Sequence, residues 1–254
     1  MIFPAGPTAV RPTFSRRQGR VDWIVNAKHS LYGRYFVDDY TLKAFFDPHD
    51  ILVTSVTGNV ERATTFVLGD TYTLSGSTVN SFHATLGRRS NNRGPNANGV
   101  NMATLGASNL YQGTPNFLQV AVNNGGFAVG CGTCALGRFP VTSFQYADDV
   151  DILRGKHQIA FGVDFIRTRE IQENHYNDNG VFSFSGQYSN DPLLDFLTGK
   201  MNTFNQSGQQ LNDLRQNIFG MYVQDTYHVT RTLVANIGLR WRELDCTVRC
   251  HAVV

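Results

Sequence analysis

Four cysteines are the first side chains in the sequence whose type and spacing could do chemistry. Cys131 and Cys134 form a Cys-Gly-Thr-Cys run with zinc-ligand or redox spacing, and Cys246 and Cys250 could supply two further thiolates. The second pair has a different spacing, and the first lies in a glycine-rich stretch without the strand–helix–strand pattern of a thioredoxin-like motif. We therefore expect a small loop disulfide between Cys131 and Cys134, or free thiols, and no metal site.

Three closely spaced carboxylates are the next candidates. Asp148, Asp149 and Asp151 resemble the start of a calcium-binding loop, but the glycine and the terminal glutamate of that motif are missing at the required offsets. A solvated turn is therefore the favoured interpretation of this segment.

Histidines and nucleophiles point to no catalytic constellation. His49, His157, His175 and His228 fall beside expected turns, and neither the HExxH spacing of zinc proteases nor a Gly-x-Ser-x-Gly nucleophile motif occurs. The sequence accordingly predicts no enzyme, no cofactor, and no catalytic, cofactor-binding or metal-binding residues. It leaves the ligand-binding residues unknown.

Composition narrows the class of protein further. Charged residues make up 17% of the 254 residues, against about 25% in an average soluble domain. The formal net charge is only +2 and no Lys/Arg-rich run is present, so a nucleic-acid partner is not expected. No apolar run is long enough for a membrane helix, and the first residues lack the features of a signal peptide. If the protein is exported, we expect the given chain to be a fragment or an internal domain.

Period-two alternation of apolar and polar residues is the main structural signal. It is clearest from Leu233 to Trp241, and it recurs over Ile159–Phe165 and Phe82–Leu86. Weaker candidate strands are Val21–Lys28, Leu31–Tyr40, Glu61–Tyr72, Phe139–Val150, Val181–Tyr188 and Asn217–Val229. Several have the length of about 9–11 residues that a tilted membrane strand needs. The sequence therefore predicts an all-β fold, an antiparallel transmembrane β-barrel segment with nine to twelve strands.

The connections between these strands differ in length, as the two ends of an outer-membrane barrel do. Val229–Thr232 is as short as a periplasmic turn, whereas Ser90–Gly126 is long, rich in Asn and Gly, and typical of an extracellular loop. Asp191 followed by Pro192 predicts a helix of one or two turns with Asp191 as its N-cap, the only helix expected. The prediction is a partial barrel with long extracellular loops and short periplasmic turns.

Three sequence blocks resemble, in the same order, segments of TonB-dependent outer-membrane receptors, particularly the Oar-like subgroup. They are GKHQIAFGVDFIRTRE (Gly155–Glu170), VFSFSGQYSNDPLLDFLTG (Val181–Gly199) and NIFGMYVQDTYHVTRTLVANIGLRWRE (Asn217–Glu243). Upstream, Val21–Tyr40 resembles an earlier strand pair of that subgroup, which ends in Gly-Arg-Tyr. The resemblance covers roughly residues 20–243.

This resemblance implies a domain organisation and a function. Residues 1–19 would be an irregular N-terminal segment, residues 20–243 a partial receptor-like barrel, and residues 244–254 an atypical, truncated tail. The barrel would lie in outer-membrane lipid and take up a scarce ligand by gated import. A separate plug domain and the TonB complex would be its partners, and the small-molecule or peptide ligand stays unidentified.

In such a barrel, alternation assigns side chains to a lipid face and a lumen face. Aromatic residues near the expected strand ends would form interfacial girdles or, in a soluble sheet, cross-strand contacts. These residues are Trp23, Tyr32, Tyr35, Tyr222, Tyr227 and Trp241. The residues expected to point into the lumen, where Asp and Arg can pair with a plug, are Gly162, Asp164, Asn236, Gly238 and Arg240.

Two alternatives remain open at this point. The same alternation could pack two sheets together in a secreted or surface β-rich adhesin or binding protein. The chain could also neither fold nor function alone, because an open sheet exposes strand edges that invite aggregation.

Overall fold

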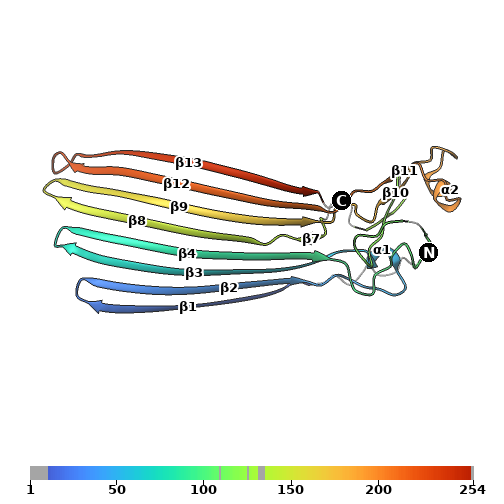
Figure 1. Cartoon of the computed structure of the whole chain (residues 1–254), viewed down its shortest axis with the longest axis horizontal. Coiled ribbons are helices and arrows are strands. Elements are labelled where there is room, and N and C mark those ends of the chain that lie inside the picture. Colours follow the sequence, from blue (N-terminus) through green and yellow to red (C-terminus); the bar gives the residue numbers. More distant parts are fainter. Residues whose placement is uncertain (1–10, 109, 125, 131–134, 253–254) are drawn as a thin grey trace.

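One large antiparallel sheet dominates the computed structural model, which describes residues 11–252 except residues 109, 125 and 131–134 (Figure 1). Eight long strands run side by side, and each is antiparallel to the next long strand in the chain. They are β1 (Thr13–Asn26), β2 (His29–Leu42), β3 (Gly58–Ser75), β4 (Thr78–Gly94), β8 (Val141–Arg154), β9 (His157–Asn174), β12 (Gln210–His228) and β13 (Val234–Ala252). A short strand, β7 (Gly137–Arg138), bridges β4 and β9 beyond the end of β8.

Lateral hydrogen bonding holds this sheet in one register over nearly the whole strand length. Strands β9 and β12, for example, pair without interruption from His157 opposite Tyr227 to Asn174 opposite Gln210. Each inner strand thereby satisfies its backbone groups on both sides. Within the described residues β1 pairs only with β2, and β13 only with β12, so the sheet is open at two edges.

The two ends of the sheet differ as the sequence predicts. At one end, which we call the turn end, short turns at residues 27–28, 76–77, 155–156 and 229–233 join consecutive strands. At the other end, the loop end, residues 43–57, 95–140 and 175–209 form long connections that fold together into a cap (Figure 1).

The cap contains a second, small sheet and most of the buried apolar side chains. Its strands are β5 (Gln119–Val122), β6 (Ala128–Val129), β10 (Val181–Phe184) and β11 (Thr203–Asn205), in the order β11-β10-β5-β6 with β10 parallel to β5. Phe117, Leu118, Val122, Leu136 and Phe184 are all buried there, whereas Val37 and Ala160 are the buried apolar residues among the described positions of the eight long strands. The long strands therefore leave both faces of the sheet uncovered by protein.

Two short helices lie in the cap. Helix α2 (Pro192–Leu197) follows the prediction closely: the Asp191 carboxylate accepts the backbone N–H of Leu193 at 2.9 Å, and Pro192 occupies the first turn. Helix α1 (Ile51–Thr54) was not expected, because a four-residue helix is too short to show a 3.6-residue period. The described residues contain no helix that is long and apolar enough to cross a membrane.

Several expected boundaries are wrong. Strand β1 begins at Thr13, so residues 13–19 are not irregular, and β13 continues to Ala252 through the tail that we expected to break the pattern. The expected loop at 90–126 includes the end of β4 and all of β5, and the strand expected over 181–188 ends at Phe184. Counted with β7, the large sheet has nine strands in the described residues, at the lower end of the nine to twelve expected.

Two tyrosine rings lie directly over glycines of the neighbouring strand. Tyr222 is opposite Gly162 in the register, and a Cβ at Gly162 would lie 2.7 Å from the Tyr222 ring and 2.2 Å from Asp149 Oδ1. Tyr32 covers Gly69 in the same way. The rings shield backbone that would otherwise be bare.

We predict that Gly162→Val destabilises the sheet by about 1–3 kcal/mol, because the added atoms must displace the Tyr222 ring. The free energy of unfolding, from a urea titration of the chain in detergent micelles, measures this effect. Gly19→Val is the control, since no atom lies within 4 Å of a Cβ at that position. Equal stability of the two variants would contradict the packing argument.

Candidate functional site

The structure describes only some of the four cysteines, so it tests the cysteine predictions only in part. Cys131 and Cys134 lie outside the described residues, so their disulfide stays a prediction. Cys246 has an exposed, free thiol. Cys250 lies four residues further along the extended strand β13, which separates the two backbone positions by about 13 Å. The expected absence of a metal site at the cysteines stays a prediction.

The three aspartates expected in a solvated turn lie inside strand β8 instead. Asp148 is on one face of the sheet and accepts a hydrogen bond from Asn80 Nδ2 at 2.6 Å. Asp149 and Asp151 are on the other face, where the hydroxyl of Tyr222 donates to Asp149 Oδ1 at 2.7 Å. The turn prediction failed because successive side chains of a strand alternate between faces, which separates charges that look clustered in the sequence.

Three of the histidines pair with carboxylates, and His175 also lies 3.6 Å from Glu173. His157 Nδ1 lies 2.6 Å from Asp225 Oδ2, His29 Nε2 lies 2.8 Å from Asp70 Oδ1, and His175 Nδ1 lies 2.8 Å from Asp178 Oδ2. In the part of the chain that the structure describes, no three His, Cys, Asp or Glu side chains converge on one point.

One face of the large sheet carries most of its exposed large apolar side chains, and we call it the outer face. It bears the odd-numbered residues of β1, β2, β9, β12 and β13 and the even-numbered residues of β3, β4 and β8. Its apolar belt comprises Val21, Trp23, Leu31, Tyr35, Phe66, Leu68, Phe82, Leu86, Phe144, Tyr146, Phe161, Val163, Phe165, Phe219, Met221, Val223, Ile237, Leu239 and Trp241. Ile237 and Leu239 are 71% and 73% exposed, which a protein surface in water does not tolerate over so wide an area.

Polar side chains mark both ends of this belt along the strands, and the distance between them gives the height of the belt. On the turn side lie Asp225 and Asn80, and on the loop side of the same strands lie Arg215 and Arg88. The separations are ten and eight residues, which at about 3.3 Å per residue and a tilt of about 45° correspond to about 19–23 Å. The apolar band of membrane barrels is about 25 Å tall. The belt therefore has the height of a bilayer core.

The girdle prediction holds for only two of its six aromatic residues. Trp23 and Tyr227 lie on the outer face near the turn end, where His157 stacks on Tyr227 with ring centroids 4.4 Å apart. Tyr35 and Trp241 are on the outer face but in the middle of their strands. Tyr32 and Tyr222 are on the opposite face, because their positions in the strands have the other parity.

The opposite, inner face is polar and contains ion pairs within the height of the belt. Arg240 lies 3.5 Å from Asp164, and Arg20 pairs with Asp22 at 2.7 Å while its guanidinium lies over the Tyr32 ring. A few apolar residues are also exposed on this face, such as Leu153 near the turn end of β8 and Leu244 near the middle of β13. Such a surface is suited to water or to a polar partner.

All five residues predicted to face the lumen lie together on this inner face. Gly162, Asp164, Asn236, Gly238 and Arg240 occupy even-numbered positions of β9 and β13, which the register places on one side of the sheet. Asp164 and Arg240 pair with each other at 3.5 Å, which the sequence did not predict. Pairing with a plug stays a prediction.

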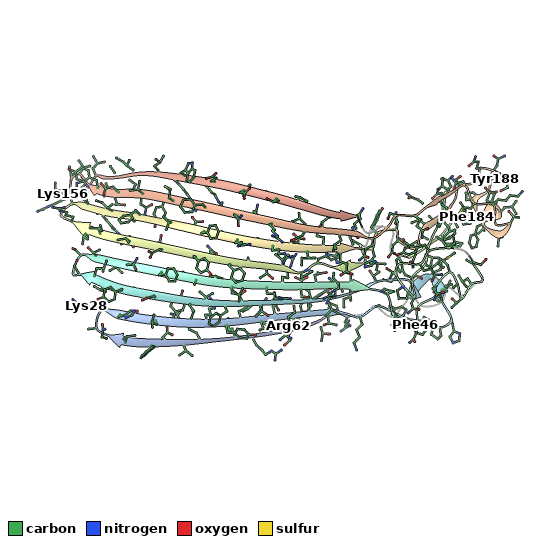
Figure 2. All side chains as sticks on the ribbon, in the orientation of Figure 1. Lys28, Phe46, Arg62, Lys156, Phe184 and Tyr188 are labelled. Atoms are coloured by element: carbon green, nitrogen blue, oxygen red, sulfur yellow. The ribbon has the colours of Figure 1, made fainter. Side chains whose placement is uncertain are left out.

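A cavity of about 470 Å³ opens in the cap and has an entirely apolar lining. The Phe196 ring stands edge-on to Phe127 and Phe184, with centroid distances of 5.0 and 5.2 Å, and Val120 and Leu52 complete the nearest walls. Figure 2 shows Phe184 within the cap, beyond the end of the long strands. The cavity could hold an apolar group that approaches from the loop end.

Asp195 ties the α2 region of the cap together. Its side chain is fully buried, and its Oδ2 accepts the backbone N–H of Tyr188 at 3.1 Å. Burial alone would raise the pKa of Asp195, but hydrogen bonds from Ser189 and Tyr188 and the charge of Lys200 outweigh it and lower the pKa below the ordinary value.

Comparison with known proteins identifies relatives of this architecture. A family model described as an outer membrane beta barrel domain matches residues 7–247. The crystal structure of the outer membrane transporter YddB from Escherichia coli superimposes with a TM-score of 0.53 and 11% sequence identity, over 92% of this chain and 28% of the transporter. The chain thus spans little more than a quarter of the length of that protein. None of the curated proteins compared with the chain matches it.

We predict that an arginine is costly on the outer face and tolerated on the inner face. Met221→Arg, in the middle of the belt on β12, should destabilise the membrane-inserted chain by about 2–4 kcal/mol. Gln224→Arg, three residues further on the inner face of the same strand, should change stability by less than about 1 kcal/mol. Unfolding in lipid vesicles gives both values, and equal costs would show that the two faces are wrongly assigned.

We also predict that acid loosens the α2 region. A lowered pKa means that the ionised Asp195 stabilises the fold above its unfolded pKa, and that this contribution is lost as the pH falls through the folded pKa. Hydrogen exchange of the Tyr188 amide, compared between pH 5 and pH 3, should therefore accelerate beyond the intrinsic pH effect. In Asp195→Asn this extra change should be absent; if it persists there, another group is responsible.

Proposed function

The chain belongs to the outer membrane beta barrel domain family, and on that premise we propose that it forms part of the wall of a TonB-dependent receptor of the Oar-like subgroup. In this proposal the receptor imports a scarce ligand through a gated lumen. Whatever the receptor class, the chain is an antiparallel β-barrel segment of the outer membrane.

The observation that carries the proposal is the single-layer sheet with an apolar face of bilayer height and a polar face behind it. An apolar outer surface matches lipid, while ion pairs such as Arg240 with Asp164 on the inner face suit a hydrated lumen. The three sequence blocks that resemble Oar-like receptors supply the receptor class, and the fold shared with an outer membrane transporter is consistent with it.

The open edges support a share of a larger barrel. Strands β1 and β13 each have one neighbour in the described residues, so eight strands leave two rows of backbone donors and acceptors to be paired by further strands. The proposal assigns the strands from β1 to β13 to the wall of a barrel whose remaining strands, plug domain and TonB contact lie outside this segment. Transport would involve no covalent chemistry, so we propose a non-enzymatic role.

An adhesin built from two packed sheets fits less well. Its core would lie between the sheets, whereas here the apolar side chains of the long strands are exposed on one face of one layer, as for Val163 at 47%. The four-stranded sheet lies in the cap at the loop end and does not cover that face (Figure 1).

Gated access to the inner face is the feature that separates a TonB-dependent receptor from an open pore. In a variant whose four cysteines are replaced by serine, Gln145→Cys places a single thiol on the inner face of β8. If a plug covers this position, a water-soluble maleimide should label it slowly in intact cells. Labelling should be several-fold faster in energised cells with TonB than in cells without TonB.

Phe144→Cys is the matched control, since the adjacent residue is on the outer face and belongs to the apolar belt. Its labelling should be low and independent of TonB. Equal labelling rates at Gln145→Cys with and without TonB would refute gated import and leave the barrel wall itself unaffected.

A further inference from the structure

A single row of the register crosses all eight long strands and consists almost entirely of arginine and threonine. Directly paired neighbours follow one another from β1 to β13 without a break. We call these residues the arginine–threonine row: Arg17, Val37, Thr64, Arg88, Thr142, Arg169, Arg215 and Thr247. No carboxylate stands in this row.

The row lies on the outer face. On β4 and β8 it comes directly beyond the loop-side edge of the apolar belt, whereas on β9, β12 and β13 the outer-face residues Arg167, Asn217 and Glu243 come first. Two residues nearer the turn end on the same strands stand Leu86 and Phe144, which belong to the belt. Two residues from Arg169 and Thr64, Arg167 and Arg62 lie on the same face and extend the row. Figure 2 shows Arg62 toward the loop end of the sheet, far from Lys28 and Lys156 at the turn end. Arg88 and Arg167, two residues beyond Leu86 and Phe165 of the belt, are therefore at the level where a bilayer core gives way to head groups.

Carboxylates of the protein neutralise only some of the arginines at this edge. Asp213 accepts from both Arg169 and Arg215, at 2.9 and 2.8 Å. Asp39 lies 3.1 Å from Arg17 and 3.4 Å from Arg62.

Arg88 and Arg167 are exposed and have no ion pair in the described structure. The outer-face carboxylates Glu243 and Asp245 lie on β13, three strands away from β8. The centre of positive charge is therefore where β4, β8 and β9 meet, around Arg88, Thr142 and Arg167.

The turn-side edge of the belt has the opposite character. Its polar side chains next to the belt include Asp70, Asp148 and Asp225, and two of these carboxylates pair with histidines. If the polar side chains only anchored the sheet at the two bilayer surfaces, the turn-side and loop-side edges of the belt would carry similar groups. The asymmetry instead indicates that the loop-side edge meets anionic groups.

The choice of arginine over lysine points to the kind of anion. All four lysines, Lys28, Lys43, Lys156 and Lys200, lie in turns and loops, so every cation within the eight long strands is an arginine or a histidine. The planar guanidinium fork donates two parallel hydrogen bonds to a phosphate, which an ammonium group cannot do. Thr142 stands between Arg88 and Arg169 in the register and adds a hydroxyl donor.

We propose that the arginine–threonine row, with Arg167, binds the phosphate groups of anionic lipids in the membrane leaflet at the loop end. The apolar belt holds the acyl chains, and the guanidinium groups directly beyond it hold the head groups. This inference depends on the outer-face assignment and not on TonB or on gated import.

Lipid retention by the full chain tests the proposal. The protein is extracted from the outer membrane in a neutral detergent and titrated with lipid A, a glycolipid with two phosphates, and with its enzymatically dephosphorylated form. We expect tight association of the phosphorylated lipid and on the order of 10-fold or greater loss with the dephosphorylated one. This comparison requires no substitution, so it is independent of any folding defect.

Charge variants then locate the site. Arg88→Gln with Arg167→Gln should weaken association with the phosphorylated lipid by about 30-fold, because each cation near an anionic surface contributes about fivefold. Arg34→Gln with Arg89→Gln removes the same charge from the inner face and should leave association unchanged. Arg88→Lys with Arg167→Lys keeps the charge without the fork and should give an intermediate loss.

Four outcomes would overturn the proposal. One is equal association of the phosphorylated and dephosphorylated lipids, and another is equal loss in the outer-face and inner-face double variants. The third is full competition by inorganic phosphate at millimolar concentration, which would show a free-anion site instead of a lipid site. Retention of an acidic protein in place of lipid at this edge would overturn it as well.

Discussion

Every backbone amide within a bilayer core must find its hydrogen-bond partner inside the protein, and the rest of this structure depends on that constraint. The eight long strands satisfy it laterally, through registers such as that of β9 with β12, which runs unbroken from His157 to Asn174. Lateral pairing keeps the strands extended, so neighbouring side chains point to opposite faces. It also leaves β1 and β13 each with an unpaired edge in the described residues, which we propose is paired by further strands.

The register turns alternation along each strand into rows across the sheet, and the chemistry is organised by row. Apolar side chains form a belt of bilayer height, carboxylates lie along its turn side, and arginines lie along its loop side. On the inner face the same rows bring Tyr222 over Gly162 and within 2.7 Å of Asp149. Ion pairs, ring contacts and lipid contacts all follow from which residues are directly opposite one another.

Sequence analysis predicted the elements whose alternation lies within the belt, and it failed where strands extend beyond it. The apolar positions from Leu233 to Trp241 predicted both a strand and its outer face, and Asp191 before Pro192 predicted helix α2. Beyond Trp241 the outer positions are Glu243 and Asp245, so the amphipathic pattern stops while pairing with β12 continues to Ala252. The strand there is maintained by a partner that no single-strand pattern reveals.

Prediction of the candidate site succeeded and failed for the same reason. Alternation along each strand correctly placed Asp164 of β9 and Arg240 of β13 on the inner face. The arginine–threonine row could not be predicted, because its members come from different strands and only the register brings them into line.

The pleat also constrains how such a sequence can change over time. Removing one residue inside β13 would exchange its faces beyond that point, turning Arg240 toward lipid and Ile237 or Leu239 toward the lumen. Length changes within the strands must therefore come in pairs or at bulges. In the 95–140 and 175–209 connections, segments outside β5, β6, β7, β10, β11 and α2 can change length without exchanging the faces of the sheet, and recognition can diversify there.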